Sequence, residues 1–127
     1  MVGVVGSSPI APTNLHMKIL QWLDTTEVDE LAGAIAAELI KRVPPSRLES
    51  QGRKAADRLR NTHEAIFARA AKFARTRKLN IYKKARLGNQ FRWALKEAGY
   101  PAEFVESWTY ELIALVASNA AARGGSS

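Results

Sequence analysis

The chain has 127 residues, no cysteine and a formal net charge of +7 at pH 7. Without cysteine it can form neither disulfides nor thiolate metal sites. Hydrophobic residues make up 46% and charged residues 24%, the balance of a globular domain rather than of a disordered chain. No apolar run approaches the roughly 20 residues that a membrane span needs. We therefore expect a cytoplasmic protein with no membrane contact.

Residues 1–16 are predicted to be a disordered, non-native leader. The run Gly-Ser-Ser-Pro at 6–9 can be encoded by the T-loop of a tRNA, and residues 13–14 can be encoded by its CCA end. The leader thus resembles a translated tRNA 3′ end, which predicts a native start at Met17 and a gene directly downstream of a tRNA gene. Such a position is compatible with cargo of a mobile element. The alternative is an ordinary Gly/Ser/Pro leader.

Apolar residues at spacings of three and four predict an all-α fold, either a small four-helix bundle or an orthogonal helical array. We expect a single helical domain over residues 17–119 and a frayed tail at 120–127. The side chains expected to be buried are Leu39, Ile66, Phe73, Leu95, Trp108 and Leu112. The expected helices run from Asp24 to the Pro44-Pro45 pair, from near Ser46 to about Lys78, from Ile81 to Ala98, and from Pro101.

Capping signals mark where these helices begin. Asp24 stands three residues before Glu27, and Ser46 stands three residues before Glu49, which is the spacing of a capping box. Asn80 is a further N-cap candidate. These pairs predict helix starts at about residues 24, 46 and 80.

Glycines mark where the helices break. Gly52 weakens the start of the second helix, so a break there is one alternative. The pair at 88–89 suggests a kink or a new start within the third helix, whose expected buried face includes Ala85. Gly99 suits the left-handed position that ends a helix, and Pro101 follows two residues later. The third and fourth helices must therefore be neighbours.

Charge is distributed unevenly along the chain. The net charge is −2 over residues 17–45, +11 over 46–100 and −2 over 101–127. Such a basic block attracts polyanions, and Lys or Arg contacts to phosphates release counterions. The candidate nucleic-acid-binding residues are Lys54, Arg58, Arg69, Lys72 and Arg75 on the second helix, and Lys83, Lys84, Arg86 and Arg92 on the third.

Four other interpretations of these segments stay open. The basic side chains can be the solvated outer faces of a bundle. The third helix can be a recognition helix, with Arg86, Asn89, Gln90 and Arg92 suited to base edges. The aromatic residues Tyr82, Phe91, Trp93 and Tyr100 can stack on unpaired bases. Alternatively, Trp93, Tyr100, Phe104 and Trp108 can form a packed corner or a groove for a peptide or ligand.

Little in the sequence points to catalysis. Beyond the leader, His63 is the lone histidine, and the acidic pairs at 29–30 and 103–106 stand in first turns of helices, where carboxylates favour the dipole anyway. No residues have the spacing of metal ligands. We therefore expect a binding protein with no catalytic role, no metal and no cofactor. Its ligand is nucleic acid or, as the alternative, a protein partner or a second copy in a protein-interaction module.

Overall fold

The computed structural model describes residues 24–125, and these form four α-helices and no strand. The helices are α3 (Thr26–Arg42), α4 (Arg53–Thr76), α5 (Ile81–Ala98) and α6 (Ala102–Gly125), and a 3₁₀ turn (Pro45–Arg47) precedes α4. They pack as a small bundle, which confirms the all-α prediction. The predicted leader at 1–16 lies outside the described residues. α6 extends to Gly125, beyond the domain boundary at residue 119 that the sequence predicts.

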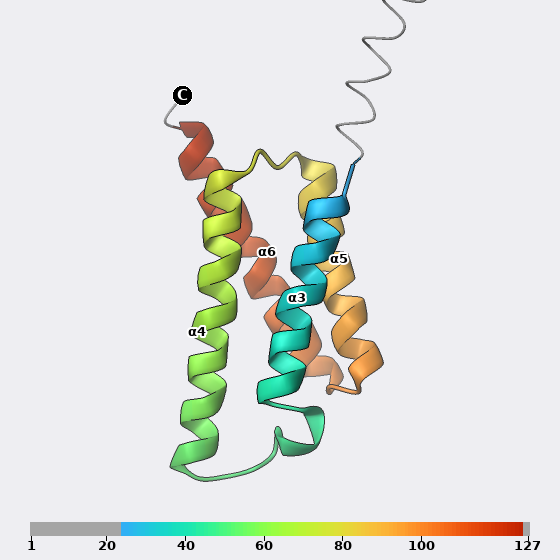
Figure 1. Ribbon diagram of the computed structural model, residues 1–127, viewed down its shortest axis with the longest axis vertical. Coiled ribbons are helices and arrows are strands. Elements are labelled where there is room, and N and C mark those ends of the chain that lie inside the picture. Colours follow the sequence, from blue (N-terminus) through green and yellow to red (C-terminus); the bar gives the residue numbers. More distant parts are fainter. Residues whose placement is uncertain (1–23, 126–127) are drawn as a thin grey trace, which may run out of the picture.

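The helices alternate in direction, but they do not follow one another around the bundle. α3 packs against α4 and α5, and α6 packs against the same two helices (Figure 1). α4 and α5, although consecutive in the sequence, therefore stand diagonally across the bundle. The connection at 77–80 crosses this diagonal, so α3 runs parallel to α5, and α4 runs parallel to α6.

The start of α3 differs from the predicted capping box. The Asp24 carboxylate accepts hydrogen bonds from the backbone N–H of Thr26 at 3.0 Å and from its hydroxyl at 2.7 Å. These bonds stabilise the charged carboxylate and so lower the pKa of Asp24. Glu27 does not reach back to Asp24 but pairs with Arg77, Oε2 to Nε 3.2 Å. The Asp24–Glu27 capping box is therefore wrong, because Glu27 finds a cationic partner beyond the end of α4.

The predicted start of the second helix near Ser46 is also wrong. Only a 3₁₀ turn forms there, and α4 begins at Arg53. Gly52 stands between the two with φ 113°, a left-handed conformation that side chains disfavour, so the chain breaks at this glycine. Two other signals are confirmed. Asn80 accepts from the Lys83 N–H at 2.7 Å, and Gly99 ends α5 with φ 102°.

Gly88 does not kink α5, which is continuous over Ile81–Ala98. Gly88 is buried, and a Cβ placed on it would lie 2.5 Å from Cδ1 and 2.6 Å from Cγ1 of Ile113 on α6. The glycine therefore allows close contact between two helices, and the interruption predicted at 88–89 is wrong.

This contact predicts that the effect of Gly88→Ala depends on Ile113. In an Ile113→Ala background the clash is removed, and Cγ2 of Thr109 lies 3.9 Å from the added methyl group, which is an ordinary contact. The helix propensity of alanine should then raise the unfolding free energy by about 1 kcal/mol. In the wild-type background the clash should reduce or reverse that gain. Urea titrations of the four proteins measure the coupling. An equal effect in both backgrounds would contradict the close packing.

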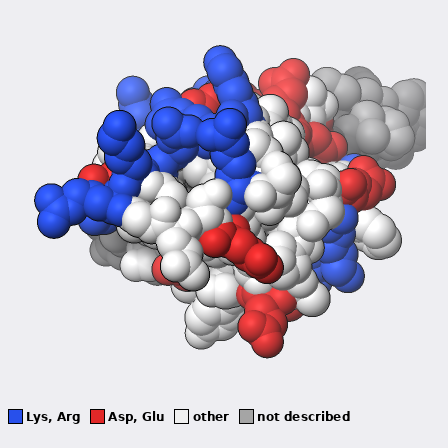
Figure 2. Space-filling view, turned by 90° about the horizontal axis from the view of Figure 1, so that it is seen from below, with Lys and Arg blue, Asp and Glu red and all other residues white. Residues whose placement is uncertain are grey.

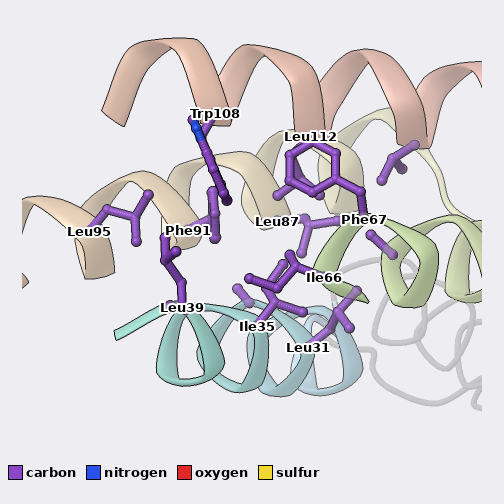
Figure 3. Packing of buried hydrophobic residues seen from close by; sticks show 14 of the residues in the cluster. Leu31, Ile35, Leu39, Ile66, Phe67, Leu87, Phe91, Leu95, Trp108 and Leu112 are labelled. Carbon is purple, nitrogen blue, oxygen red and sulfur yellow. The ribbon is translucent and has the colours of Figure 1, made fainter. Parts of the chain in front are cut away.

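The core lies along the bundle axis and contains five of the six side chains predicted to be buried (Figure 3). The exception is Phe73, which is partly buried, with the guanidinium carbon of Arg77 5.7 Å from its ring centroid. Leu87 was not predicted, yet it is 1% exposed, whereas Ala85 is exposed. The buried face of α5 is therefore centred on Leu87, Phe91 and Leu95.

Tyr100 links the α5–α6 turn to the end of α3. Its hydroxyl donates to the backbone carbonyl of Val43, and the residue is 5% exposed. Burial disfavours the phenolate and raises the pKa of Tyr100 to about 12. The bond fixes the position of the last turn of α3 relative to α6.

Removing this hydroxyl should change how stability depends on pH. The pKa of Tyr100 rises from 10.0 in the unfolded chain to about 12 on folding. The protonated phenol therefore stabilises the fold below pH 10, and that contribution is lost as the pH rises through about 12. Tyr100→Phe should lower the free energy of unfolding by about 1 kcal/mol at neutral pH. Because the variant has no hydroxyl to ionise, its stability should not show this loss at high pH. Denaturant titrations should show the two proteins converging above pH 10, and a gap that stays constant would contradict this.

Candidate nucleic-acid interface

Two adjoining grooves lie where the end of α3 meets the start of α4. Arg42, Lys54 and Arg58 line both of them. Lys41, with Asp57, Asn61 and Thr62, completes one groove, and Arg47, with Ser50 and Gln51, completes much of the other. Seen from this end of the bundle, Lys and Arg side chains gather on one side (Figure 2). We call this surface the basic groove and define it by Lys41, Arg42, Arg47, Lys54 and Arg58.

Most of the positive charge in the basic groove is uncompensated. Arg42 pairs with Glu38, Nε to Oε2 2.5 Å, and the carboxylate of Asp57 pairs with Arg60 at 2.8 Å. Within the part of the chain that the structure describes, the other four cations form no ion pair. They are Lys41, Arg47, Lys54 and Arg58. Four cations from three elements thus face one surface without an acidic partner.

The predicted cations of α4 lie in different surroundings. Lys54 and Arg58 lie in the basic groove, whereas Arg69 and Lys72 line a second groove nearer the other end of α3. That groove also contains the carboxylates of Glu27 and Glu30 and the guanidinium of Arg77. Arg75 turns toward α6 and donates to the side chain of Asn119 at 2.9 Å. The second groove therefore carries mixed charge.

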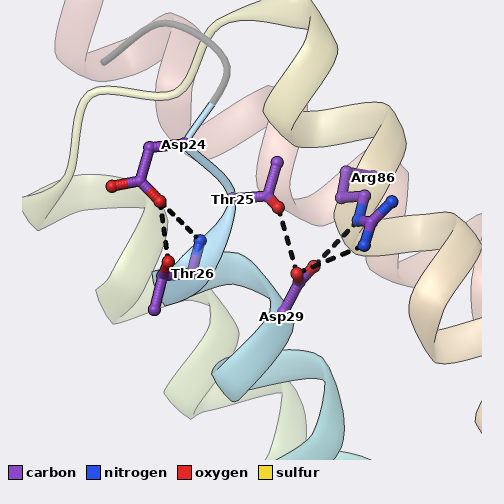
Figure 4. A network of polar contacts seen from close by, with 5 residues as sticks. All are labelled: Asp24, Thr25, Thr26, Asp29 and Arg86. Atoms are coloured by element: carbon purple, nitrogen blue, oxygen red, sulfur yellow. Dashed lines mark hydrogen bonds and ion pairs between the residues drawn. The ribbon is translucent and has the colours of Figure 1, made fainter. Parts of the chain in front are cut away.

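The predicted cations of α5 are not brought to the basic groove. Arg86 donates to both carboxylate oxygens of Asp29 on α3, at 3.0 and 3.3 Å (Figure 4). These bonds raise the pKa of Arg86 further above its ordinary value. Arg92 pairs with Glu106 of α6 at 3.1 Å. Both arginines thus connect helices within the bundle, which weakens the recognition-helix interpretation. Lys83 and Lys84 are half-buried at the start of α5.

Sequence reasoning missed Lys41, Arg42 and Arg47. Dividing the chain by net charge placed the first two in an acidic segment, and Arg47 was counted in the basic block without a position. The fold brings the last turn of α3 beside the first turn of α4, so neighbouring charges come from differently charged segments. The adjacent basic pair just before Pro44-Pro45 was the signal that could have revealed them.

The aromatic residues divide between the core and a different face. Tyr100, Phe104 and Trp108 stack in a column, with ring centroids 5.0 and 4.7 Å apart, which supports corner packing. Phe91 is fully buried. Trp93 and Tyr82, which are 55% and 38% exposed, stand on α5 and do not line the basic groove. The side chains proposed for base stacking are therefore buried or separated from the unpaired cations.

His63 is part of the α4–α6 contact. Its Nε2 lies 3.1 Å from Oε1 of Glu111, and its ring stacks on Phe67 at 4.1 Å. Among the described residues, no group of three or more acidic or histidine side chains could hold a metal ion. In the same residues, no helix combines the length and apolarity needed to cross a bilayer.

No protein-family model, curated protein or solved structure matched the chain.

Proposed function

We propose that this is a small basic helical protein that binds nucleic acid phosphates through the basic groove, in the cytoplasm, without catalysis or a cofactor. The observation that carries the proposal is the set of four unpaired cations, Lys41, Arg47, Lys54 and Arg58, gathered on one surface. Cations that served only to connect the helices of the bundle would form ion pairs with carboxylates, as Arg86 and Arg92 do.

The start of α4 adds to the attraction for anions. Gly52 precedes the helix and offers no side-chain cap to its first backbone N–H groups. The positive end of the helix dipole therefore opens beside Lys54 and Arg58, where phosphate oxygens are favourable partners. Ser50, Gln51 and Asn61 supply polar groups at the edges of the grooves.

The test is a fluorescence anisotropy titration of labelled nucleic acid over a series of salt concentrations. If all four unpaired cations contact phosphates of duplex DNA, a plot of log affinity against log salt should have a slope of about −3.6. Failure to bind at micromolar protein and physiological salt would refute the proposal.

A second candidate function is association with another protein chain through the outer face of α5 and α6. Tyr82 and Ile113 line a groove there and are each 38% exposed, and Tyr110, one turn before Ile113, is 75% exposed. Large exposed apolar groups on one face are typical of interaction sites. Sedimentation equilibrium tests the simplest case, in which Tyr110→Glu would convert a dimer into a monomer.

A further inference from the structure

From the composition of the basic groove we infer that its ligand is a double helix, held by its phosphates, rather than a single strand. This inference rests on the proposed function and names the class of nucleic acid. Its first premise is that, among the described residues, no aromatic side chain lines either part of the groove. Surfaces that bind single strands combine a positive groove with aromatic rings, on which bases stack at about 1–3 kcal/mol each.

The second premise is where the exposed rings lie. Trp93 stands on α5, with the Nζ of Lys96 5.8 Å from its ring centroid, and Tyr110 stands on α6. The basic groove is formed by α3, α4 and the segment between them. Among the residues that the structure describes, a strand held by the unpaired cations would thus find no ring in the groove for its bases. A duplex needs none, because its bases already stack on one another and it presents only phosphates.

The third premise is that helices of the bundle hold the cations at defined positions. Lys41 is in the last turn of α3, and Lys54 and Arg58 are in the first turns of α4, one helical turn apart. Two helices of a packed bundle hold these residues, so the spacing of the charges is largely set before binding. A ligand with regularly spaced, stiffly held phosphates matches such an array with less loss of conformational entropy than a flexible strand.

The inference is tested by competition at equal salt. A labelled mixed-sequence DNA duplex is displaced by unlabelled DNA duplex, RNA duplex or single-stranded oligothymidine, all with the same number of phosphates. We expect both duplexes to compete about tenfold or more better than the single strand, since charge density is higher on a duplex. The better competitor of the two duplexes shows which kind of double helix the basic groove prefers.

Trp93→Ala gives a second measurement. It should leave the affinity for every probe unchanged, because Trp93 lies outside the basic groove. Tighter binding of oligothymidine, or a loss of affinity in Trp93→Ala, would overturn the inference and leave nucleic-acid binding intact. If no probe binds, the proposed function itself fails.

Discussion

Truncating Phe91 to Ala is expected to lower the free energy of unfolding by about 3–5 kcal/mol. Phe91 is 0% exposed and lies between Leu39 of α3 and Trp108 of α6 (Figure 3). Removing its ring leaves a cavity bordered by three helices that tight turns and ion pairs hold in place, so the space cannot collapse fully. A loss of this size is a large part of the stability of a small domain. Chemical denaturation monitored by circular dichroism measures it.

Trp93→Ala is the matched control for this truncation. It removes an even larger ring two residues away on the same helix, but that ring is 55% exposed. We expect a loss of less than about 1 kcal/mol, since few packing contacts are given up. Similar losses for the two variants would mean that the buried face of α5 has been assigned wrongly.

Neutralising Lys54 and Arg58 together is expected to have the largest effect on binding. The variant Lys54→Gln/Arg58→Gln removes two of the four unpaired cations of the basic groove. Two lost phosphate contacts should reduce the log–log salt slope on duplex DNA by about 1.8. Affinity should fall roughly tenfold or more in low salt, which corresponds to at least about 1.4 kcal/mol. Anisotropy titrations across a salt series measure both quantities.

The control is Arg69→Gln/Lys72→Gln, which removes one Lys and one Arg from the same helix and lowers the net charge equally. Arg69 and Lys72 share their groove with Glu27 and Glu30, so they should contribute little to phosphate binding. The slope should stay close to that of the wild type. Equal effects of the two double variants would show that net charge, and not the basic groove, determines the affinity.

The fold could be predicted largely from apolar spacing and turn chemistry. Asn80 and Gly99 act as predicted, because each requires only a local backbone geometry. The predictions of a helix start at Ser46 and of an interruption at Gly88 were wrong for the same reason. The capping-box spacing at Ser46 predicts a helix start, but a 3₁₀ turn and Gly52 separate Ser46 from α4. In a sequence, a glycine that allows contact with Ile113 cannot be distinguished from a glycine that breaks a helix. Such distinctions depend on tertiary contacts.

The candidate site was less accessible to sequence reasoning. Lys54, Arg58, Arg69 and Lys72 could be assigned to one helix from the sequence, but the sequence could not show which carboxylates lie near them. The diagonal placement of α4 and α5 could not be predicted from the sequence either, since a short connection usually joins neighbouring helices. Pairing decides which cations are available to a ligand, and pairing between helices follows only from the packed bundle.

The meeting of α3 and α4 has a consequence for stability in the bound state. α3 packs more extensively on α5 than on α4, so the α3–α4 boundary is the least reinforced side of the bundle. A phosphate backbone that contacted both Lys41 and Lys54 would cross that boundary and oppose its opening. We expect bound duplex to slow amide hydrogen exchange most in the first turns of α4. Uniform slowing along all helices would mean that the ligand does not bridge this boundary.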